Sequence, residues 1–205
     1  MGIFGRRKKE AAERVDGSGA AELQAMRDAA AQAYTAGDYP VAVQLLRILM
    51  DAGDTGVAPL LGSALGLMGN FDGAEDVFRE SSAEGDFRAT YALIGLLQRK
   101  PGAALGGEEQ WDLLGVATKQ LHDEVRPLVD AGRLAEAEAL LRIGADAGDP
   151  MAQESLAKVL MQRDGDNPEV AAEAKVWLER AIAAGLRDAA HTLEAVEEVL
   201  RSNGR

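Results

Sequence analysis

Cysteine is absent from this 205-residue chain, which excludes disulfide bonds, thiolate nucleophiles and cysteine-ligated metal sites. Aromatic residues are scarce at 4%, whereas alanine, leucine and the 23 glycines are abundant, a composition that favours closely packed helices over strands. No stretch approaches the roughly 18–20 apolar residues of a membrane span, and the N-terminus lacks the apolar core of about 7–15 residues of a secretory signal. We therefore expect an all-α, cytoplasmic protein.

Positive charge is also in short supply, because 22 Lys and Arg residues face 34 Asp and Glu residues, for a net charge of −12. Four of the cations are adjacent, at Arg6, Arg7, Lys8 and Lys9, so the chain from residue 10 onward carries 18 cations against 34 anions, or −16. An acidic body of this kind repels nucleic acid phosphates. We expect no nucleic acid partner.

The first 19 residues combine this basic run with several glycines and few apolar side chains, which predicts a flexible tail. Ile3 and Phe4 lie beside Arg6, Arg7, Lys8 and Lys9, so the tail could contact an anionic membrane and make the protein membrane-peripheral. The competing interpretation is a solvated tail, because two apolar side chains bury little area.

Glycine recurs at a fixed interval through the rest of the chain. Three pairs are sixteen residues apart and a fourth is twenty apart: Gly37 and Gly53, Gly69 and Gly85, Gly132 and Gly148, Gly165 and Gly185. Alanine and then a large apolar residue follow the first glycine of each pair, at Ala42 and Leu46, Ala74 and Phe78, Ala137 and Leu141, Ala174 and Leu178. A short residue and then leucine follow the second, at Val57 and Leu61, Ala89 and Leu93, Ala152 and Leu156, Ala189 and Leu193. This register predicts an array of helical hairpins.

Each position in the register has a physical reason. Glycine adopts a positive φ at the end of a helix without steric cost, and Asp54, Asp86 and Asp149 directly after it can cap the next helix. The alanines let helix backbones approach, and the leucine one turn later fills the space between neighbouring hairpins. One hairpin alone leaves an apolar face wet, so the hairpins must stack, and an uncapped terminal unit could self-associate.

These residues resemble the tetratricopeptide repeat superfamily, and the unit after Gly148 resembles its Sel-one-like branch. The matching motifs are Ala58-x-x-Leu61-Gly62 followed by Gly69, Ala74 and Phe78, then Trp111-x-x-Leu114-Gly115, then Ala152-x-x-x-Leu156 followed by Trp177, Leu178, Ala181 and Gly185. The resemblance covers about residues 20–200. It implies a right-handed α-solenoid of stacked antiparallel hairpins whose first helices line a concave surface.

The register is lost between residues 100 and 131. Residues 101–107 predict a glycine-rich loop, and residues 108–124 predict a helix with Trp111, Leu114 and Leu121 on one side. Counting back from Gly132 puts Glu124 at the leucine position, and Pro127 indicates a kink or a helix end. Residues 108–131 are therefore either a degenerate repeat or a joint between N-terminal repeats at 20–100 and C-terminal repeats at 132–203.

The sequence offers little catalytic chemistry. The two histidines, His122 and His191, lie in different units without another ligand at metal-binding spacing, and the serines, among them Ser63 and Ser155, lack a GxSxG turn or an identifiable base. Asp164-Gly165-Asp166-Asn167 departs from a calcium loop and predicts a turn with Asn167 as N-cap and Pro168 at the first helical position. Neighbouring carboxylates such as Glu136 and Glu138 should be solvated. We expect no enzyme, no metal and no cofactor.

The function that remains is a protein interaction scaffold that binds a peptide or protein segment; the alternative is a localisation factor recruited to a membrane by the basic tail. The resemblance places the following residues on the concave face: Gln24, Arg27, Tyr34, Arg88, Tyr91, Gln98, Glu154, Lys158, Met161 and His191. Arg88 and Tyr91 are the first candidates, since Tyr and Arg often anchor interfaces. Gly56, Pro59, Ser63 and Gly66 would form a smooth strip that accepts a peptide backbone or a partner helix.

Overall fold

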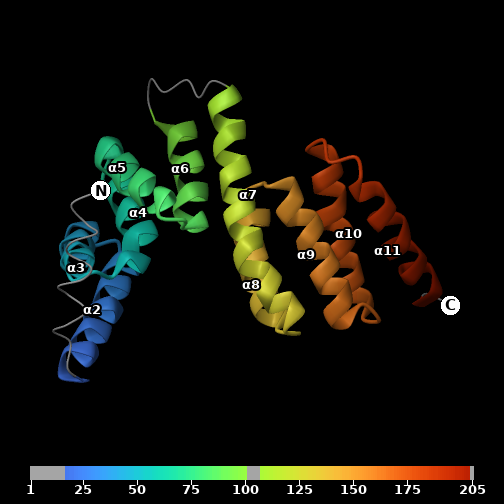
Figure 1. Cartoon of the computed structure of the whole chain (residues 1–205), viewed down its shortest axis with the longest axis horizontal. Helices are drawn as coiled ribbons and strands as arrows, with labels where there is room; N and C mark the ends of the chain where they lie inside the picture. The colour runs from blue at the N-terminus through green and yellow to red at the C-terminus, as the bar shows by residue number, and fades with distance from the viewer. Residues whose placement is uncertain (1–16, 101–106, 204–205) are drawn as a thin grey trace. The chain divides into compact units, whose positions relative to one another are not determined.

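The computed structural model describes residues 17–100 and 107–203, and the regular elements in these ranges are all helical. The helices form two compact units that divide between Leu105 and Gly106 (Figure 1). The prediction of an all-α array of helical hairpins is confirmed. The side chains expected to contact a membrane, Ile3, Phe4, Arg6, Arg7, Lys8 and Lys9, lie outside the described residues, as does most of the predicted loop at 101–107.

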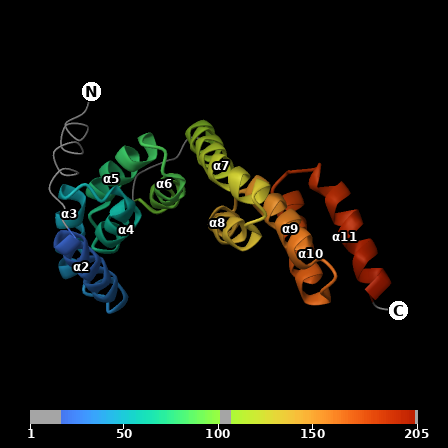
Figure 2. The same cartoon turned by 60° about the horizontal axis from the view of Figure 1, so that its bottom comes forward.

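The first unit is built from helices that each pack against the next one along the chain. They are α2 (Gly17–Thr35), α3 (Tyr39–Asp51), the short 3₁₀ helix η1 (Thr55–Val57), α4 (Ala58–Leu67), α5 (Phe71–Ala83) and α6 (Phe87–Arg99). α4 also contacts α6, because alternate helices of a hairpin stack become neighbours (Figure 2). The two helices of a hairpin therefore lie in different layers of the unit.

The second unit repeats this arrangement. Its helices are α7 (Gly107–Asp130), α8 (Leu134–Asp146), α9 (Pro150–Asp164), α10 (Pro168–Ala183) and α11 (Ala189–Asn203), and each packs against its successor. α9 is the central helix, because it contacts α7, α8, α10 and α11. None of the described helices is long and apolar enough to cross a membrane.

The predicted glycine turns are present. A positive φ occurs at Gly37, Gly53, Gly69, Gly85, Gly132, Gly148 and Gly185. Gly165 is the exception in the register, because its φ is −68°. At this α9–α10 turn Asn167 caps α10 instead, since its side chain accepts a hydrogen bond from the backbone N–H of Glu169 in the first turn of the helix. The chain turns there without a left-handed residue, so the four extra residues of this repeat replace the usual glycine geometry.

Aspartate capping is confirmed at two of the three predicted positions. Asp86 and Asp149 accept backbone N–H groups at the starts of α6 and α9. Asp54 makes no capping hydrogen bond, because η1 intervenes before α4, and its carboxylate instead lies 2.5 Å from Nε of Arg27 on α2. The prediction of a cap at Asp54 was therefore wrong, and this residue ties two helices together.

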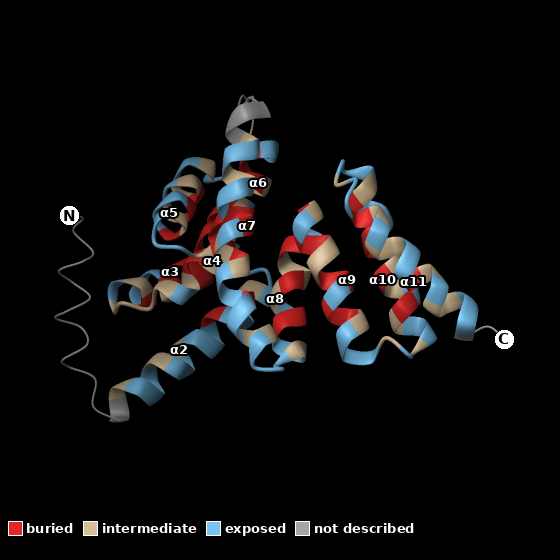
Figure 3. Ribbon diagram, turned by 45° about the vertical axis from the view of Figure 1, so that its right-hand side comes forward, coloured by how far each residue is buried: buried red, intermediate tan, exposed pale blue. Residues whose placement is uncertain are grey.

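The core follows the predicted register closely (Figure 3). Ala42, Ala74, Ala137 and Ala174 are fully buried, and Leu46, Phe78, Leu141 and Leu178 are at most 2% exposed. The first helices contribute buried residues at Ala89, Ala152 and Ala189 and at Leu61, Leu93 and Leu156. Two residues at these register positions are only half-buried: Val57, which lies in η1, and Leu193, which lies in α11, the last described helix.

Helix α7 follows the same pattern in a shifted register. Glu124, which the register places at the leucine position of this repeat, is exposed. Leu121, three residues before it, takes the leucine position instead, and Ala117, one turn further back, takes the position of the small residue; both are fully buried. α7 also continues through Pro127 to Asp130, so of the two predicted alternatives at this proline, a kink or a helix end, the helix end was wrong. Pro127 removes one hydrogen bond on an exposed side of the helix, where water can satisfy the freed carbonyl. α7 is thus the first helix of a hairpin with α8, and with 24 residues against the 13 of α8 it is longer by about three turns.

Glu138 corrects another expectation. It is 8% exposed rather than solvated, and its carboxylate accepts hydrogen bonds from Arg142, at 2.8 Å, and from Arg163 on α9. Arg142 also donates to Glu173 on α10 at 2.6 Å, and this hydrogen bond lowers the pKa of Glu173. Because that pKa is lower in the folded than in the unfolded chain, the stabilisation is present at neutral pH and is lost as the pH falls through the folded-state value. These ion pairs join three helices.

Replacing Glu138 by alanine should lower the free energy of unfolding of the second unit by about 1–3 kcal/mol, because Arg142 and Arg163 lose a buried, charged acceptor. Glu136 is the matched control. It lies two residues earlier on α8 and pairs with Arg133 at an exposed site, where water screens the pair, so Glu136→Ala should cost much less than Glu138→Ala. Urea unfolding followed by circular dichroism measures both losses, and equal losses would contradict the role given to the buried network.

Candidate functional site

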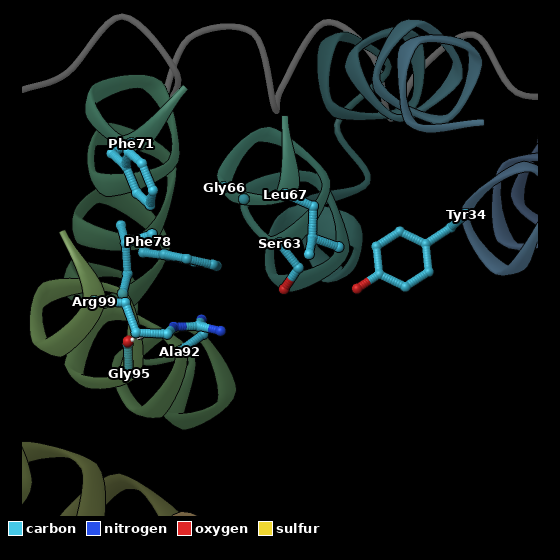
Figure 4. A pocket seen from close by; sticks show the side chains of 11 residues that line it. Tyr34, Ser63, Gly66, Leu67, Phe71, Phe78, Ala92, Gly95 and Arg99 are labelled. Carbon is cyan, nitrogen blue, oxygen red and sulfur yellow. Dashed lines mark hydrogen bonds between the residues drawn. The ribbon is translucent and has the colours of Figure 1, made fainter. Parts of the chain in front are cut away.

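A hollow of about 470 Å³ opens in the first unit, where three alternate helices converge (Figure 4). Its walls are Tyr34 on α2, Gly62, Ser63, Gly66 and Leu67 on α4, and Ala92, Gly95, Leu96 and Arg99 on α6, with Phe71 and Phe78 of α5 beneath. α4 carries no charged residue along its whole length. The hollow is therefore formed mainly by the first helices of successive hairpins, as the resemblance implies for a binding surface.

Small residues give this hollow its depth. A Cβ added at Gly62 would lie 2.4 Å from Cε1 of Phe78, so glycine is needed for α4 to rest on the Phe78 ring. A Cβ at Gly66 would lie 3.3 Å from Cδ1 of Leu96, whereas one at Gly95 would have no neighbour within 4 Å. The Gly95 position therefore faces open space inside the hollow.

Three polar groups lie around this space. In Figure 4 the Tyr34 ring extends from α2 toward Ser63, and the Arg99 guanidinium extends toward the same space. The edge-to-face contact of Tyr34 with Tyr39, at 5.7 Å between centroids, orients the phenol. Among the described residues, neither the Tyr34 nor the Ser63 hydroxyl has a hydrogen-bond partner. Both hydroxyls are thus available to a ligand.

Arg99 is the charged member of the lining. Its Nε donates to the Gly95 carbonyl oxygen at 2.9 Å, which fixes the side chain along its own helix. The next residue, Lys100, forms ion pairs within the protein, because its Nζ lies 2.6 Å from a carboxylate oxygen of Asp72 and 2.8 Å from one of Glu75. The hydrogen bond from Lys100 lowers the pKa of Glu75. One cation at the end of α6 is consequently paired within the protein, while the other faces the hollow.

Of the residues predicted on the first unit's concave face, the structure brings Tyr34 to the hollow. Two of the others are engaged with carboxylates elsewhere, since Gln24 donates to Asp28 and Arg27 to Asp54. Ser63 and Gly66 of the predicted smooth strip do line the hollow, whereas Gly56 and Pro59 do not.

The three residues predicted on the concave face of α6 do not line the hollow, and the structure contradicts the choice of Tyr91 as an anchor. Tyr91 is 6% exposed, and its ring packs edge-on against Phe87 at 6.3 Å, so it offers no surface anchor. Arg88 places its guanidinium 4.4 Å from the centre of the Phe87 ring, and neither Arg88 nor Gln98 lines the hollow. The face toward the hollow consists of Ala92, Gly95, Leu96 and Arg99, of which Ala92 and Arg99 directly follow the predicted Tyr91 and Gln98.

The second unit has a groove of about 400 Å³ between α7 and α9, lined in part by His122, Arg126, Ser155 and Lys158. Of the four residues predicted here, Lys158 lines this groove. Glu154 pairs with Lys158 at 2.8 Å and accepts from Thr192, whereas Met161 is half-buried and His191 is exposed outside it.

No base near Ser155 could be identified from the sequence, but the structure brings His122 to it, with 3.0 Å between Nε2 of His122 and Oγ of Ser155. The two residues are 33 apart in sequence, so only the pairing of α7 with α9 could reveal the contact. Ser155 lies within α9, where backbone N–H groups are used by the helix and cannot form an oxyanion hole. The arrangement therefore supports a polar link between helices rather than acyl transfer.

Trp111 was expected to pack on the same side of its helix as Leu121, but it is 65% exposed. It lines a largely apolar hollow of about 450 Å³ between α7 and the start of α9, together with Leu114, Pro150 and Met151. Within the described ranges no three His, Asp or Glu side chains converge closely enough to hold a metal ion.

Comparisons with known proteins add little to this geometry. No protein-family profile matches the chain, and no curated protein matches it in sequence. Among solved structures, the TPR domain of P58(IPK) is similar with a TM-score of 0.35 and 15% identity, covering 89% of this chain and 67% of that one. Get4 of C. therm. is similar with a TM-score of 0.30 and 19% identity, covering 98% of this chain and 64% of that one.

Proposed function

We propose that the chain is a non-enzymatic interaction scaffold whose first unit binds a peptide segment in the hollow between α2, α4 and α6. The observation that carries this proposal is the hollow itself: its floor is made of glycine and phenylalanine, and its walls carry two hydroxyls without partners. The open space at Gly95, which has no Cβ, lets a ligand backbone approach α6 closely, and the aromatic and leucine side chains supply apolar area.

The repeats of this scaffold are, in our proposal, of the tetratricopeptide type, with the Sel-one-like variant in the second unit. The support is the register of small residues and leucines, whose members are buried except for the half-buried Val57 and Leu193, together with the shifted pair Ala117 and Leu121. In such an array the first helices share one surface, so a hollow between them is accessible along several repeats.

Filling the hollow should abolish binding while leaving the fold intact. A leucine at Gly95 would project into open space, and a helix interior favours leucine over glycine, so Gly95→Leu should fold. The probe is a peptide that is selected from a displayed random library by binding to the full chain, and that is then synthesised with a fluorescent label. We expect its dissociation constant, measured by fluorescence polarisation, to rise by at least about tenfold, or about 1.4 kcal/mol.

Gly115→Leu is the matched control, because Gly115 is also a helical glycine with no atom within 4 Å of an added Cβ, but it lies on α7 in the second unit. Its peptide affinity should match that of the wild type. Equal affinity for the wild type and Gly95→Leu would place the binding surface elsewhere and refute the proposal.

A further inference from the structure

We infer, building on the proposed function, that the hollow selects a peptide segment with an Asp or Glu side chain flanked by apolar residues, and that Arg99 binds the carboxylate. Arg99 would supply the charge, and the Tyr34 and Ser63 hydroxyls would donate the remaining hydrogen bonds. This assigns a specificity to the site that its shape alone does not give.

The charge distribution of the first unit favours an anionic ligand at this point. Residues 17–100 contain eleven Asp and Glu but six Lys and Arg, and four of these cations pair with carboxylates of the unit: Arg27, Arg79, Arg88 and Lys100. Arg47 and Arg99 have no carboxylate partner among the described residues. Arg47 is exposed on α3 and outside the hollow, whereas Arg99 lines it. The hollow is thus a local positive point on an acidic protein.

The geometry leaves Arg99 able to bind such a ligand. Its Nε is occupied by the Gly95 carbonyl oxygen, so the guanidinium is held in place while its two terminal nitrogens retain their donors. A carboxylate accepts up to about four hydrogen bonds, and a fixed guanidinium binds it more specifically than an ammonium group would. The Tyr34 and Ser63 hydroxyls, which face the same space in Figure 4, can donate to the carboxylate's other lone pairs.

Several features favour a carboxylate side chain over a phosphate. A phosphorylated residue carries about −1.5 to −2 charges at neutral pH, and the described lining offers one guanidinium to balance them. Leu67, Phe71 and Leu96 line the rest of the hollow, so the residues beside the acidic one should be apolar. The open space at Gly95 lets the ligand backbone continue past Arg99, which suits an internal segment.

The test uses random peptides displayed as loops inside a carrier protein, so that no ligand has a free C-terminus. Peptides selected by the full-length wild type should share one Asp or Glu at a fixed position with apolar neighbours. In a synthetic, end-blocked peptide from this pool, replacing that residue by its amide should weaken binding by about tenfold. Arg99→Gln should weaken binding of the acidic peptide by the same factor and leave the affinity for the amide peptide unchanged, whereas Arg47→Gln should change neither affinity.

Two results separate this inference from the proposed function. If Gly95→Leu abolishes binding but Arg99→Gln leaves the acidic preference intact, the hollow binds peptides and the role of Arg99 is refuted. If Gly95→Leu has no effect, or if no loop is selected, both proposals fail. A preference for phosphorylated peptides or for free chain ends in parallel binding assays would also overturn the assignment to an acidic side chain.

Discussion

Replacing Phe78 by alanine is expected to lower the free energy of unfolding of the first unit by about 3–5 kcal/mol, the range for deleting a buried aromatic ring. Phe78 is 2% exposed and lies between α5 and the glycine face of α4. Its ring also forms part of the floor of the hollow, so the deletion should leave a cavity that the rigid helices cannot close. The loss is measured by urea unfolding followed through far-ultraviolet circular dichroism.

The opposite change at the same contact gives an internal check. Gly62→Ala would push a Cβ to 2.4 Å from the Phe78 ring, so we expect a loss of about 1–3 kcal/mol from overpacking. Combined with Phe78→Ala, the added methyl occupies part of the vacated space, and the double variant should lose less than the sum of the two. Gly95→Ala, also within a helix but without neighbours, should instead stabilise by up to about 1 kcal/mol.

Purely additive losses at Gly62 and Phe78 would show that the two residues do not share a packing constraint. A stabilising Gly62→Ala would show that α4 can move away from α5 without cost. Either result would contradict the close approach that forms the floor of the hollow, and the proposed site would lose its structural basis.

The helical hairpins and much of the core were predictable because the register is local. A glycine at each turn, an alanine five residues later and a leucine one helical turn beyond are fixed by helix geometry, and Ala74 and Phe78 are buried as that spacing requires. Asp54 and Gly165 departed from the register because η1 and the longer α9–α10 turn change the local backbone. Such departures depend on only a few residues and leave the periodicity intact.

The site was less predictable because it requires a helix rotation that the sequence of α6 does not specify. Phe87, Ala89, Thr90 and Tyr91 are all buried, so apolar residues cover several faces and the spacing admits neighbouring rotations. A shift of one residue moved the expected surface from Tyr91 and Gln98 to Ala92 and Arg99. Glu138 was misjudged for a different reason: its partner Arg163 lies 25 residues away, so no local pattern indicates its burial.

Leu156→Ala should have the largest effect in the second unit, a loss of about 2–5 kcal/mol. Leu156 is fully buried in α9, the helix that contacts all four others of its unit, so truncation leaves a cavity with neighbours on every side. Both tryptophans of the chain, Trp111 and Trp177, lie in this unit. Tryptophan fluorescence during urea unfolding therefore reports the loss in the unit where the substitution lies.

Leu193 provides the matched control, because it occupies the same repeat position, eight residues after the turn glycine, but in the last helix. It is half-buried, so Leu193→Ala removes less transfer free energy and leaves a site open to water instead of a cavity. We expect the loss to be no more than about half that of Leu156→Ala. In a stack where each repeat is covered only by its neighbours, an identical side chain stabilises less at the end than in the middle. Equal losses at the two leucines would mean that α11 is covered by something beyond its hairpin partners, such as a second copy of the chain, and a concentration-dependent unfolding midpoint would then identify that copy.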